Sequence, residues 1–385
     1  MTSRPHDPSG HLLLKGLEEE VYTGDTTGHV IGMSHEIAAD LPGFATEPDS
    51  RNVEYITAPY RDYQILIDRL MAKRCALRRY LSDKGGFTLV PGSVIPLDPA
   101  ENFQISNEAN PYYRHIRDTY GTRVVTASTH INIGIDEPEE LLRVYRAMRM
   151  EASLFLALTA ASPFRDGKVT GAHSTRWQMF PETPDHVPLF ASHQQFIDWM
   201  PTQLESGAMY NSRHLWISIR PNGEETPRDL NRLELRICDR ISTPKILRGV
   251  IALYEIRVQQ ALHNRGAEPL DGRFSEDELL QIVRDNEAAA AADSLDAVTT
   301  DWRTGDKVPM KEWILALVDE AKELTSELGM DEELDPIRER LETGNLSQRW
   351  LAQVEAGATP AEVIQQAIED LTEIDQIYDP DCPSP

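Results

Sequence analysis

The chain has 385 residues, of which 40% are hydrophobic, so it is long enough to bury a substantial core. Its formal net charge of -25 argues against nucleic acid or an anionic membrane as a partner, because both require a positively charged surface. Three widely spaced cysteines, Cys75, Cys238 and Cys382, match neither a disulfide framework nor a zinc-binding spacing, which indicates a reducing, cytoplasmic environment.

Residues 1–10 are expected to form a flexible polar leader, since they lack the apolar segment of a signal peptide. No apolar run approaches the roughly 20 residues of a membrane span. Periodicity and turn residues predict the elements that follow: strands at 12–23, 52–59 and 87–93, a hairpin partner at 29–34, a helix at 62–83, and an irregular polar segment at 98–120.

The central strand is expected at residues 123–135, where side chains alternate between two faces. One face is polar and carries Thr126, Ser128, His130 and Asn132. By strand rise, His130 and Asn132 lie about 6.5 to 7 Å apart, so both could point into one cleft. The alternative is a structural histidine beside a buried, hydrogen-bonded asparagine.

Carboxylates recur on the other predicted strands. Glu18 and Glu20 share one face of the first strand, Glu54 lies on the second, and Glu234 lies on a strand at 232–239. Unpaired carboxylates that meet repel each other unless a cation neutralises them, and oxygen-rich sites suit magnesium or manganese. With His130 as a nitrogen ligand, these residues form a candidate metal site. The alternative is that each glutamate belongs to a solvated strand face.

The second half of the chain is expected to contain more helix. Asp136 is the expected N-cap of a helix that has Pro138 in its first turn and ends before Pro163. Strands at 214–223 and 232–239 should form a hairpin, in which Glu234, Arg236 and Cys238 share a face. Further helices are expected at residues 244–264, from 275 onward, at 310–328 and at 360–378.

Candidate anion-binding groups lie in two places. The long connection at residues 162–190 contains Arg165, Lys168 and Arg176, which could hold an anionic substrate or phosphate oxygens. Glu234 and Arg236 fit a metal ligand beside a phosphate clamp. They also fit an ordinary ion pair, and the loop cations also fit a solvated loop.

Several segments together resemble the glutamate–cysteine ligases of the carboxylate–amine ligase group, of the cyanobacterial type. These segments are GLEEE at 16–20, VEYITAPY at 53–60, HIN at 130–132, SPFRDGKVTGAHSTRW at 162–177, HLWISIRPNG at 214–223 and RLELRICD at 232–239. The resemblance covers roughly residues 10–262. It implies an α+β, glutamine-synthetase-like fold, in which a curved antiparallel sheet forms a funnel backed by helices. We therefore expect a catalytic core at residues 11–264 and an acidic, mainly helical region at 265–385 packed on it.

The resemblance also implies roles for individual residues. It implies that magnesium is held by Glu18, Glu20, Glu54, His130 and Glu234. It implies that Asn132 and Arg176 orient the glutamate substrate, and that Arg236 contacts the transferred phosphate, so that Glu54 and Arg236 are catalytic. Lys168 and Arg220 are implied as ATP contacts. Arg165, where relatives often have an aromatic or apolar residue, and the alanines after Asn286, where many have arginines, depart from the pattern.

The implied function is an ATP-dependent ligase that uses Mg²⁺. It would join the γ-carboxylate of L-glutamate to the amine of L-cysteine through a γ-glutamyl phosphate, for glutathione synthesis. The same mechanism with a different amine acceptor is an alternative, and a catalytically silent metal- or nucleotide-binding module is another. We expect neither nucleic acid nor a membrane as partner. No catalytic role is expected for Cys75 or Cys238, since isolated cysteines are usually core residues.

Overall fold

The computed structural model describes residues 12–99, 101–263 and 268–384. The leader expected at residues 1–10 and the domain boundary expected at 264/265 lie outside these residues. The strands are β1 Lys15–Gly24, β2 Phe44–Thr46, β3 Asn52–Ile56, β4 Thr88–Val90, β5 Thr129–Gly134, β6 Phe164–Arg165, β7 Lys168–Val169, β8 Ile219–Asn222, β9 Arg232–Leu235, β10 Val298–Thr300 and β11 Lys307–Pro309. The helices are α1 Ser34–Asp40, α2 Tyr63–Asp83, α3 Pro111–Tyr120, α4 Pro138–Thr159, α5 Thr175–Met179, α6 His193–Glu205, α7 Pro244–Leu262, α8 Glu276–Asp293, α9 Met310–Glu320, α10 Lys322–Leu328, α11 Asp335–Thr343, α12 Leu346–Glu355 and α13 Pro360–Tyr378.

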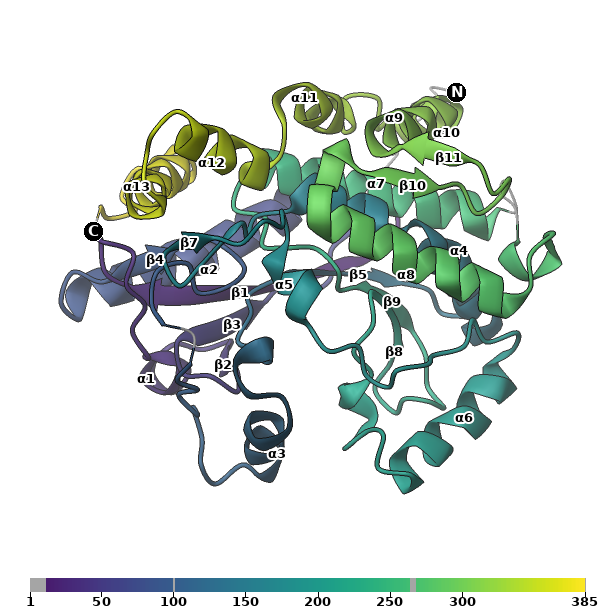
Figure 1. The fold of residues 1–385 in the computed structure, drawn as a ribbon, viewed down its shortest axis with the longest axis horizontal. Helices are drawn as coiled ribbons and strands as arrows, with labels where there is room; N and C mark the ends of the chain where they lie inside the picture. Colours follow the sequence, from purple (N-terminus) through teal and green to yellow (C-terminus); the bar gives the residue numbers. More distant parts are fainter. Residues whose placement is uncertain (1–11, 100, 264–267, 385) are drawn as a thin grey trace, which may run out of the picture.

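One sheet organises the molecule. Its strands run in the order β2-β3-β1-β5-β9-β8, and β4 pairs with the C-terminal end of β1. Every pair in this sheet is antiparallel. The α+β architecture with an antiparallel sheet is therefore confirmed (Figure 1).

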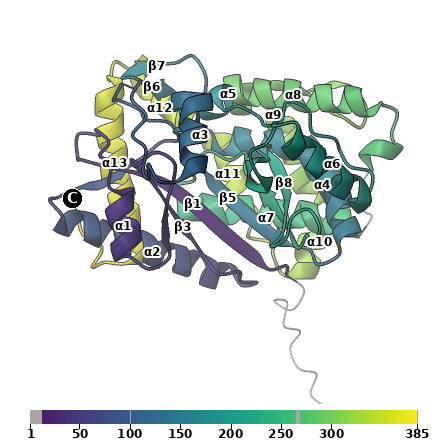
Figure 2. The ribbon, with the colours of Figure 1, turned by 90° about the horizontal axis from the view of Figure 1, so that it is seen from below.

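The two faces of this sheet have different chemistry, because strand side chains alternate. Leu17, Ile131 and Leu233 are buried in the main hydrophobic core, together with apolar residues of α2, α4 and α7. In Figure 1 the long helices α4, α7 and α8 lie above the sheet, whereas α3 and α6 lie below it. Figure 2 shows the molecule from below, where β1 runs diagonally beside β3. The face turned away from the core carries Glu18, Glu20, Glu54 and Glu234.

The C-terminal helices contact the sheet and its helices directly. A second hydrophobic cluster joins Trp350 of α12 and Ile368 of α13 to Tyr22 of β1 and Phe164 of β6. Asp375 of α13 is fully buried and accepts hydrogen bonds from two arginines of α2. The division into a catalytic core and a packed C-terminal region remains a prediction. Within the described residues, no helix is long and apolar enough to cross a membrane.

The structure differs from several predicted elements. The central strand β5 begins at Thr129 rather than at residue 123, because Gly121–Val124 forms a 3-10 helix. Part of the segment expected to be irregular is helix α3, where Asn110 caps the backbone N–H groups of Tyr112 and Tyr113 and Pro111 occupies the first turn. These two helix-start signals were in the sequence, but the polar composition masked them.

Two further expectations were wrong in detail. Residues 34–40 form helix α1, and the expected hairpin partner of β1 is reduced to one bridge between Gly24 and Val30. The N-cap of α4 is Glu137, not Asp136. The connection at 162–190 is not structureless, since it contains the β6–β7 hairpin and the short helix α5.

Candidate active site

The strand register brings the predicted glutamates together. Within the sheet, Glu20 of β1 lies opposite Glu54 of β3, and Glu18 of β1 lies opposite His130 of β5. On the other side of β5, Asn132 lies opposite Glu234 of β9. Four adjacent strands therefore direct side chains from distant parts of the sequence into one region.

Glu18, His130 and Glu234 form the tightest group. His130 Nδ1 lies 3.2 Å from a Glu18 oxygen and 3.6 Å from a Glu234 oxygen. One potential ligand atom from each of the three residues lies within 4.8 Å of the others, and His130 and Glu234 are buried. This donor set of two carboxylates and one imidazole could hold a divalent cation.

Neighbouring side chains fix the orientation of this group. The Ser128 hydroxyl donates to a Glu20 oxygen at 2.7 Å and lies 2.9 Å from His130 Nε2. Asn132 Nδ2 donates to Glu18 at 2.9 Å, whereas its buried Oδ1 has no hydrogen-bond partner in the structure. Asn132 and His130 thus lie on the same side of β5, as the alternation predicts, and the amide oxygen of Asn132 remains available to a ligand.

Glu234 lies between two cations, Arg220 of β8 and Arg236, which directly follows β9. Arg220 Nη2 of β8 lies 2.7 Å from Glu234 Oε2, Asn222 Nδ2 donates to that oxygen at 2.8 Å, and Arg236 donates to Oε1. Burial alone would raise the pKa of Glu234, but Arg220 and Arg236 hold it well below its usual range. Glu234 therefore stays ionised, and in this structure it forms the ion pair with Arg236 that the sequence allowed as an alternative.

A bulge follows β9 and changes the faces predicted there. The N–H groups of Arg236 and Ile237 both donate to the Ser218 carbonyl, at 2.8 and 3.2 Å. The extra residue keeps Arg236 on the Glu234 side and shifts the alternation by one position. As a result Cys238 is buried in the hydrophobic core and does not share the face of Glu234. The expectation of a shared face was wrong for Cys238, while its core location was expected.

Glu54 and Glu47 form a second acidic group around Glu20. Burial, then the charges of Glu18 and Glu20, raises the pKa of Glu54 to about 8. Burial and the charges of Glu20 and Glu54 also raise the pKa of Glu47 well above its ordinary value. The sequence did not indicate Glu47, because it lies in a proline-containing connection without strand periodicity. Two hydrogen bonds from Ser106 hold the backbone of this connection. The Ser106 hydroxyl donates to the carbonyl of Glu47, and the Ser106 N–H donates to the carbonyl of Pro48.

The predicted loop cations occupy different positions. Arg176 is buried and donates to the carbonyls of Ile237 and Arg236, both at 2.9 Å, and its Nε has no hydrogen-bond partner. Its guanidinium therefore lies next to the segment that carries Arg236. Lys168 is exposed on the β6–β7 hairpin, and no carboxylate of the described residues forms an ion pair with it. Arg165 donates to the Met179 sulfur at 3.4 Å.

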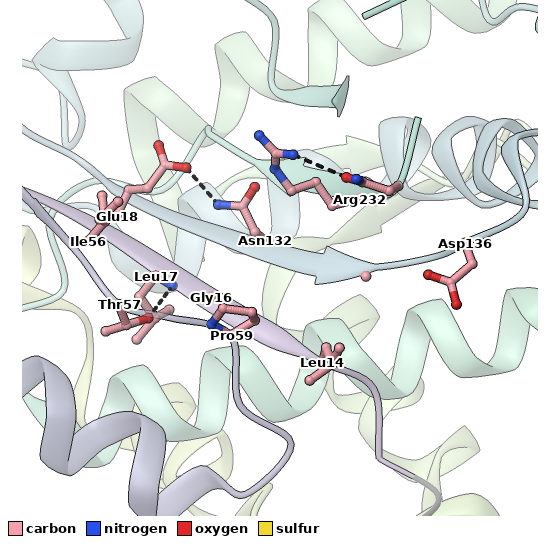
Figure 3. Close-up of a pocket in the computed structure, with 12 residues that line it drawn as sticks. Leu14, Gly16, Leu17, Glu18, Ile56, Thr57, Pro59, Asn132, Asp136 and Arg232 are labelled. Atoms are coloured by element: carbon pink, nitrogen blue, oxygen red, sulfur yellow. Dashed lines mark hydrogen bonds between the residues drawn. The ribbon is translucent and has the colours of Figure 1, made fainter. Parts of the chain in front are cut away.

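Two adjoining pockets border the glutamates. The first has a volume of about 430 Å³, and Figure 3 shows Gly16, Ile56, Pro59 and Asn132 among the residues that line it. The second, of about 480 Å³, is lined by Glu54, Arg213 and Arg220. Glu18, Ile56 and Arg232 line both pockets, so the two form one groove along the end of the sheet.

The sequence model of the family described as glutamate–cysteine ligase family 2 matches residues 14–373 of this chain. The chain belongs to glutamate–cysteine ligase family 2. A family relative, a provisionally named glutamate–cysteine ligase 2 of Thermobifida fusca, is 27% identical over 381 residues, which cover 94% of this chain and 92% of the relative.

Solved structures share the fold of this family 2 member. The bifunctional glutathione synthetase of Pasteurella multocida superimposes with a TM-score of 0.74 at 14% identity, covering 96% of this chain but only 56% of that longer protein. The glutamate–cysteine ligase of Francisella tularensis, solved in complex with AMP, superimposes with a TM-score of 0.72 at 12% identity. The superposition covers 97% of this chain and 90% of the Francisella protein. Both comparisons establish the fold, and the resemblance to glutamate–cysteine ligases stated from sequence is confirmed.

Proposed function

We propose that this family 2 ligase joins the γ-carboxylate of L-glutamate to the amine of L-cysteine, coupled to cleavage of ATP to ADP and phosphate. The product is γ-glutamylcysteine, which serves glutathione synthesis, and the intermediate is γ-glutamyl phosphate. The observation that carries the proposal is the convergence of Glu18, Glu20, Glu54 and Glu234 beside the paired cations Arg220 and Arg236. Such an arrangement suits phosphoryl transfer, where charge stabilisation supplies most of the rate enhancement.

The acidic groups fit magnesium ions. Glu18, His130 and Glu234 would hold one cation, supported by the separation of their ligand atoms, and Glu20 and Glu54 would hold another, supported by their mutual repulsion. When bound, magnesium neutralises phosphate charge and favours transfer of the γ-phosphoryl group. Ser128 and Asn132 would keep His130 and Glu18 in their orientations through the hydrogen bonds described above.

ATP would lie in the groove formed by the two pockets. The lining of the first pocket by Leu14, Ile56 and Pro59 supports it as the place of the adenosine moiety. The polar second pocket, with Arg220 and Arg232, suits the phosphates. Arg236 would donate to the transferred phosphoryl group. Lys168, exposed on its hairpin, is proposed as an ATP contact on the resemblance alone.

The glutamate substrate would be oriented by Asn132 and Arg176. The buried Oδ1 of Asn132 and the buried Nε of Arg176 lack hydrogen-bond partners, and an unpaired buried polar atom is costly unless a ligand satisfies it. The Asn132 amide oxygen would accept from an ammonium group. The Arg176 guanidinium would donate to a carboxylate.

Glu47 would act as the general base of the second step. Phosphorylation of the γ-carboxylate makes inorganic phosphate the leaving group. The acceptor's ammonium group must lose a proton before its nitrogen attacks the acyl carbon, and the Glu47 carboxylate, when ionised, can take that proton. Attack then forms the C–N bond and breaks the C–O bond to phosphate. No nucleophile of the protein is required.

The direct test measures ADP release by the purified protein with ATP, MgCl₂ and glutamate, together with a panel of amines. We expect ADP and a product with the mass of γ-glutamylcysteine to appear in equal amounts, with cysteine giving the highest kcat/KM. Preference for another amine would favour the alternative of a γ-glutamyl ligase with a different acceptor. If no amine stimulated ADP release, the protein would be a silent binding module and the proposal would be rejected.

A further inference from the structure

Two of the three cysteines meet in the folded protein. The thiol of Cys75, on α2, is the hydrogen-bond partner of the thiol of Cys382, which follows α13. Both side chains are buried, with exposed fractions of 0% and 2%. The Cys75 sulfur also lies 4.0 Å from the Asp375 carbonyl of α13. Their wide separation in the sequence did not indicate a pair, and only the packing of α13 on α2 brings the two thiols together.

Cys238 provides the contrast within the same chain. It is fully buried in the main hydrophobic core, and its hydrogen-bond partner is Thr159 rather than a second thiol. A single thiol in apolar surroundings is chemically inert. Two thiols in contact can instead be joined when both are oxidised.

The two thiols of the pair differ in reactivity. Cys75 lies within the long helix α2, whereas Cys382 lies in a turn where its N–H donates to the Asp379 carbonyl at 2.8 Å. The hydrogen bond from Cys75 lowers the pKa of the Cys382 thiol, although burial opposes this effect. The thiolate is the nucleophile in thiol–disulfide exchange, so Cys382 is the attacking residue and Cys75 the resolving one.

The contacts that hold residues 379–384 in place reach the surface. Arg79 pairs with Asp379 at an exposed position, and Gln376 Nε2 donates to the Cys382 carbonyl at 3.1 Å and to the Ser384 hydroxyl at 3.0 Å. Exposed pairs contribute little stability, so this segment can detach locally while α13 stays in place. A small reagent can then reach Cys382, and closure of the segment returns it to Cys75.

We propose that Cys75 and Cys382 form a reversible disulfide, with a low-molecular-weight disulfide as the oxidant, and that this bond fastens the segment after α13 to α2. A disulfide requires the sulfur atoms to approach to about 2.05 Å, a short movement for two thiols already in contact. Because the bond would close a very long loop of chain, its stabilising effect should be large. The proposal is independent of the ligase activity.

The exchange balances in two steps. The Cys382 thiol loses its proton, and its thiolate attacks one sulfur of the oxidant RSSR, which breaks the S–S bond and releases RS⁻. Cys75 gives its proton to a released thiolate and attacks the Cys382 sulfur of the mixed disulfide, releasing the second RS⁻, which takes up the remaining proton. Two protein thiols are thereby oxidised, and RSSR is reduced to two RSH.

The test incubates the purified full-length protein with oxidised glutathione, alkylates the remaining thiols and maps the peptides by mass spectrometry. We expect one intramolecular link between Cys75 and Cys382, an alkylated Cys238, and reversal by dithiothreitol. The oxidised protein should have a Tm higher by roughly 3 to 8 °C. Protection of Cys75 and Cys382 without a link, or a link with an unchanged Tm, would overturn the proposal.

Single variants separate the roles of the two thiols. Cys75→Ser should stop the exchange halfway, so that Cys382 retains one glutathione per chain. Cys382→Ser should leave Cys75 unmodified, because a thiol within α2 is not reached by the oxidant. Cys238→Ser is the matched control and should still form the link. Equal attachment of glutathione to Cys75 and Cys382 in the two variants would contradict the assignment of Cys382 as the attacking residue.

Discussion

Glu20 and Glu54 lie directly opposite each other on the paired strands β1 and β3. Like charges at opposed positions of an antiparallel pair destabilise it. Burial is the main cause that raises the pKa of Glu54 to about 8, and repulsion by the charges of Glu18 and Glu20 adds to the shift. The sheet thus holds two carboxylates together at a cost that a bound cation would offset.

Glu54→Gln should separate the structural from the chemical effect of this pair. At pH 9, where Glu54 is ionised, removing its charge should stabilise the metal-free protein by roughly 0.5 to 1 kcal/mol, whereas ligase activity should fall more than about 100-fold. Thermal unfolding in EDTA and in MgCl₂ measures the first effect, and magnesium should raise Tm less in the variant than in the wild type. Glu36→Gln, at an exposed position of α1, is the control. Intact turnover in Glu54→Gln would remove the metal-site assignment.

Glu47→Gln should impair only the second half of the reaction. Without a carboxylate to accept the ammonium proton, amide formation should slow by roughly 100- to 10,000-fold. Formation of the acyl phosphate should continue, and it can be followed as 5-oxoproline, to which γ-glutamyl phosphate cyclises when no amine attacks. Parallel loss of 5-oxoproline and of amide would show that Glu47 serves phosphoryl transfer, against the role proposed here.

Asp375→Asn should weaken the attachment of α13 to α2. Arg74 Nε and Arg78 Nε each donate to the Asp375 carboxylate at 2.6 Å, and all three side chains are buried. Removing the aspartate charge leaves two buried arginines without a counter-charge, which typically lowers the free energy of unfolding by about 3 to 5 kcal/mol. Urea unfolding should show a lower midpoint, and limited proteolysis should cleave α13 sooner.

Asp319→Asn provides the control for this buried pair. Asp319 also contacts two cations, Arg338 at 2.9 Å and Lys322 at 3.3 Å, but Asp319 and Lys322 are exposed and Arg338 is only half-buried. Solvent screens such pairs, so its unfolding midpoint should not change measurably. A similar small effect in both variants would mean that the Asp375 contacts contribute little.

His214→Asn should reduce the loss of stability in acid. Burial, and then the charge of His115, lowers the pKa of His214 from 6.5 to about 4. Between pH 6.5 and about pH 4 the unfolded chain binds a proton that the folded protein does not. The free energy of unfolding therefore decreases as the pH is lowered through this interval, by at most about 3 kcal/mol. The asparagine oxygen can replace Nδ1, which accepts the Tyr210 N–H at 3.0 Å.

The measurement for His214 is the urea midpoint from pH 7 to pH 4. The midpoint of His214→Asn should fall less over this interval than that of the wild-type protein. His35→Asn, at an exposed position of α1, should follow the wild type. Parallel curves for His214→Asn and the wild type would contradict the assigned proton linkage.

Much of the site could be predicted from local sequence patterns. Strand alternation alone places Glu18 with Glu20 and His130 with Asn132, because successive side chains of a strand point to opposite faces. The hairpin of β8 and β9 was likewise predictable from two apolar strands and a polar turn. The metal, substrate and phosphate roles of these residues remain predictions.

Other features depend on contacts between distant segments. Glu47 and Arg213 lie outside regular strands, so no period marks them, and only the packing of their connections brings their charges toward Glu54. The bulge after β9 required the carbonyl of Ser218, which directly precedes β8, and it moved Cys238 into the core.

The sequence by itself determined which side chains share a face, since the two-residue repeat of a strand is a local property of the backbone. Only the tertiary structure decided which faces meet. The register of β1 against β3 and β5 sets Glu20 opposite Glu54 and Glu18 opposite His130. Register follows from the burial of a whole strand face against the helices, and this burial involves residues more than a hundred positions apart.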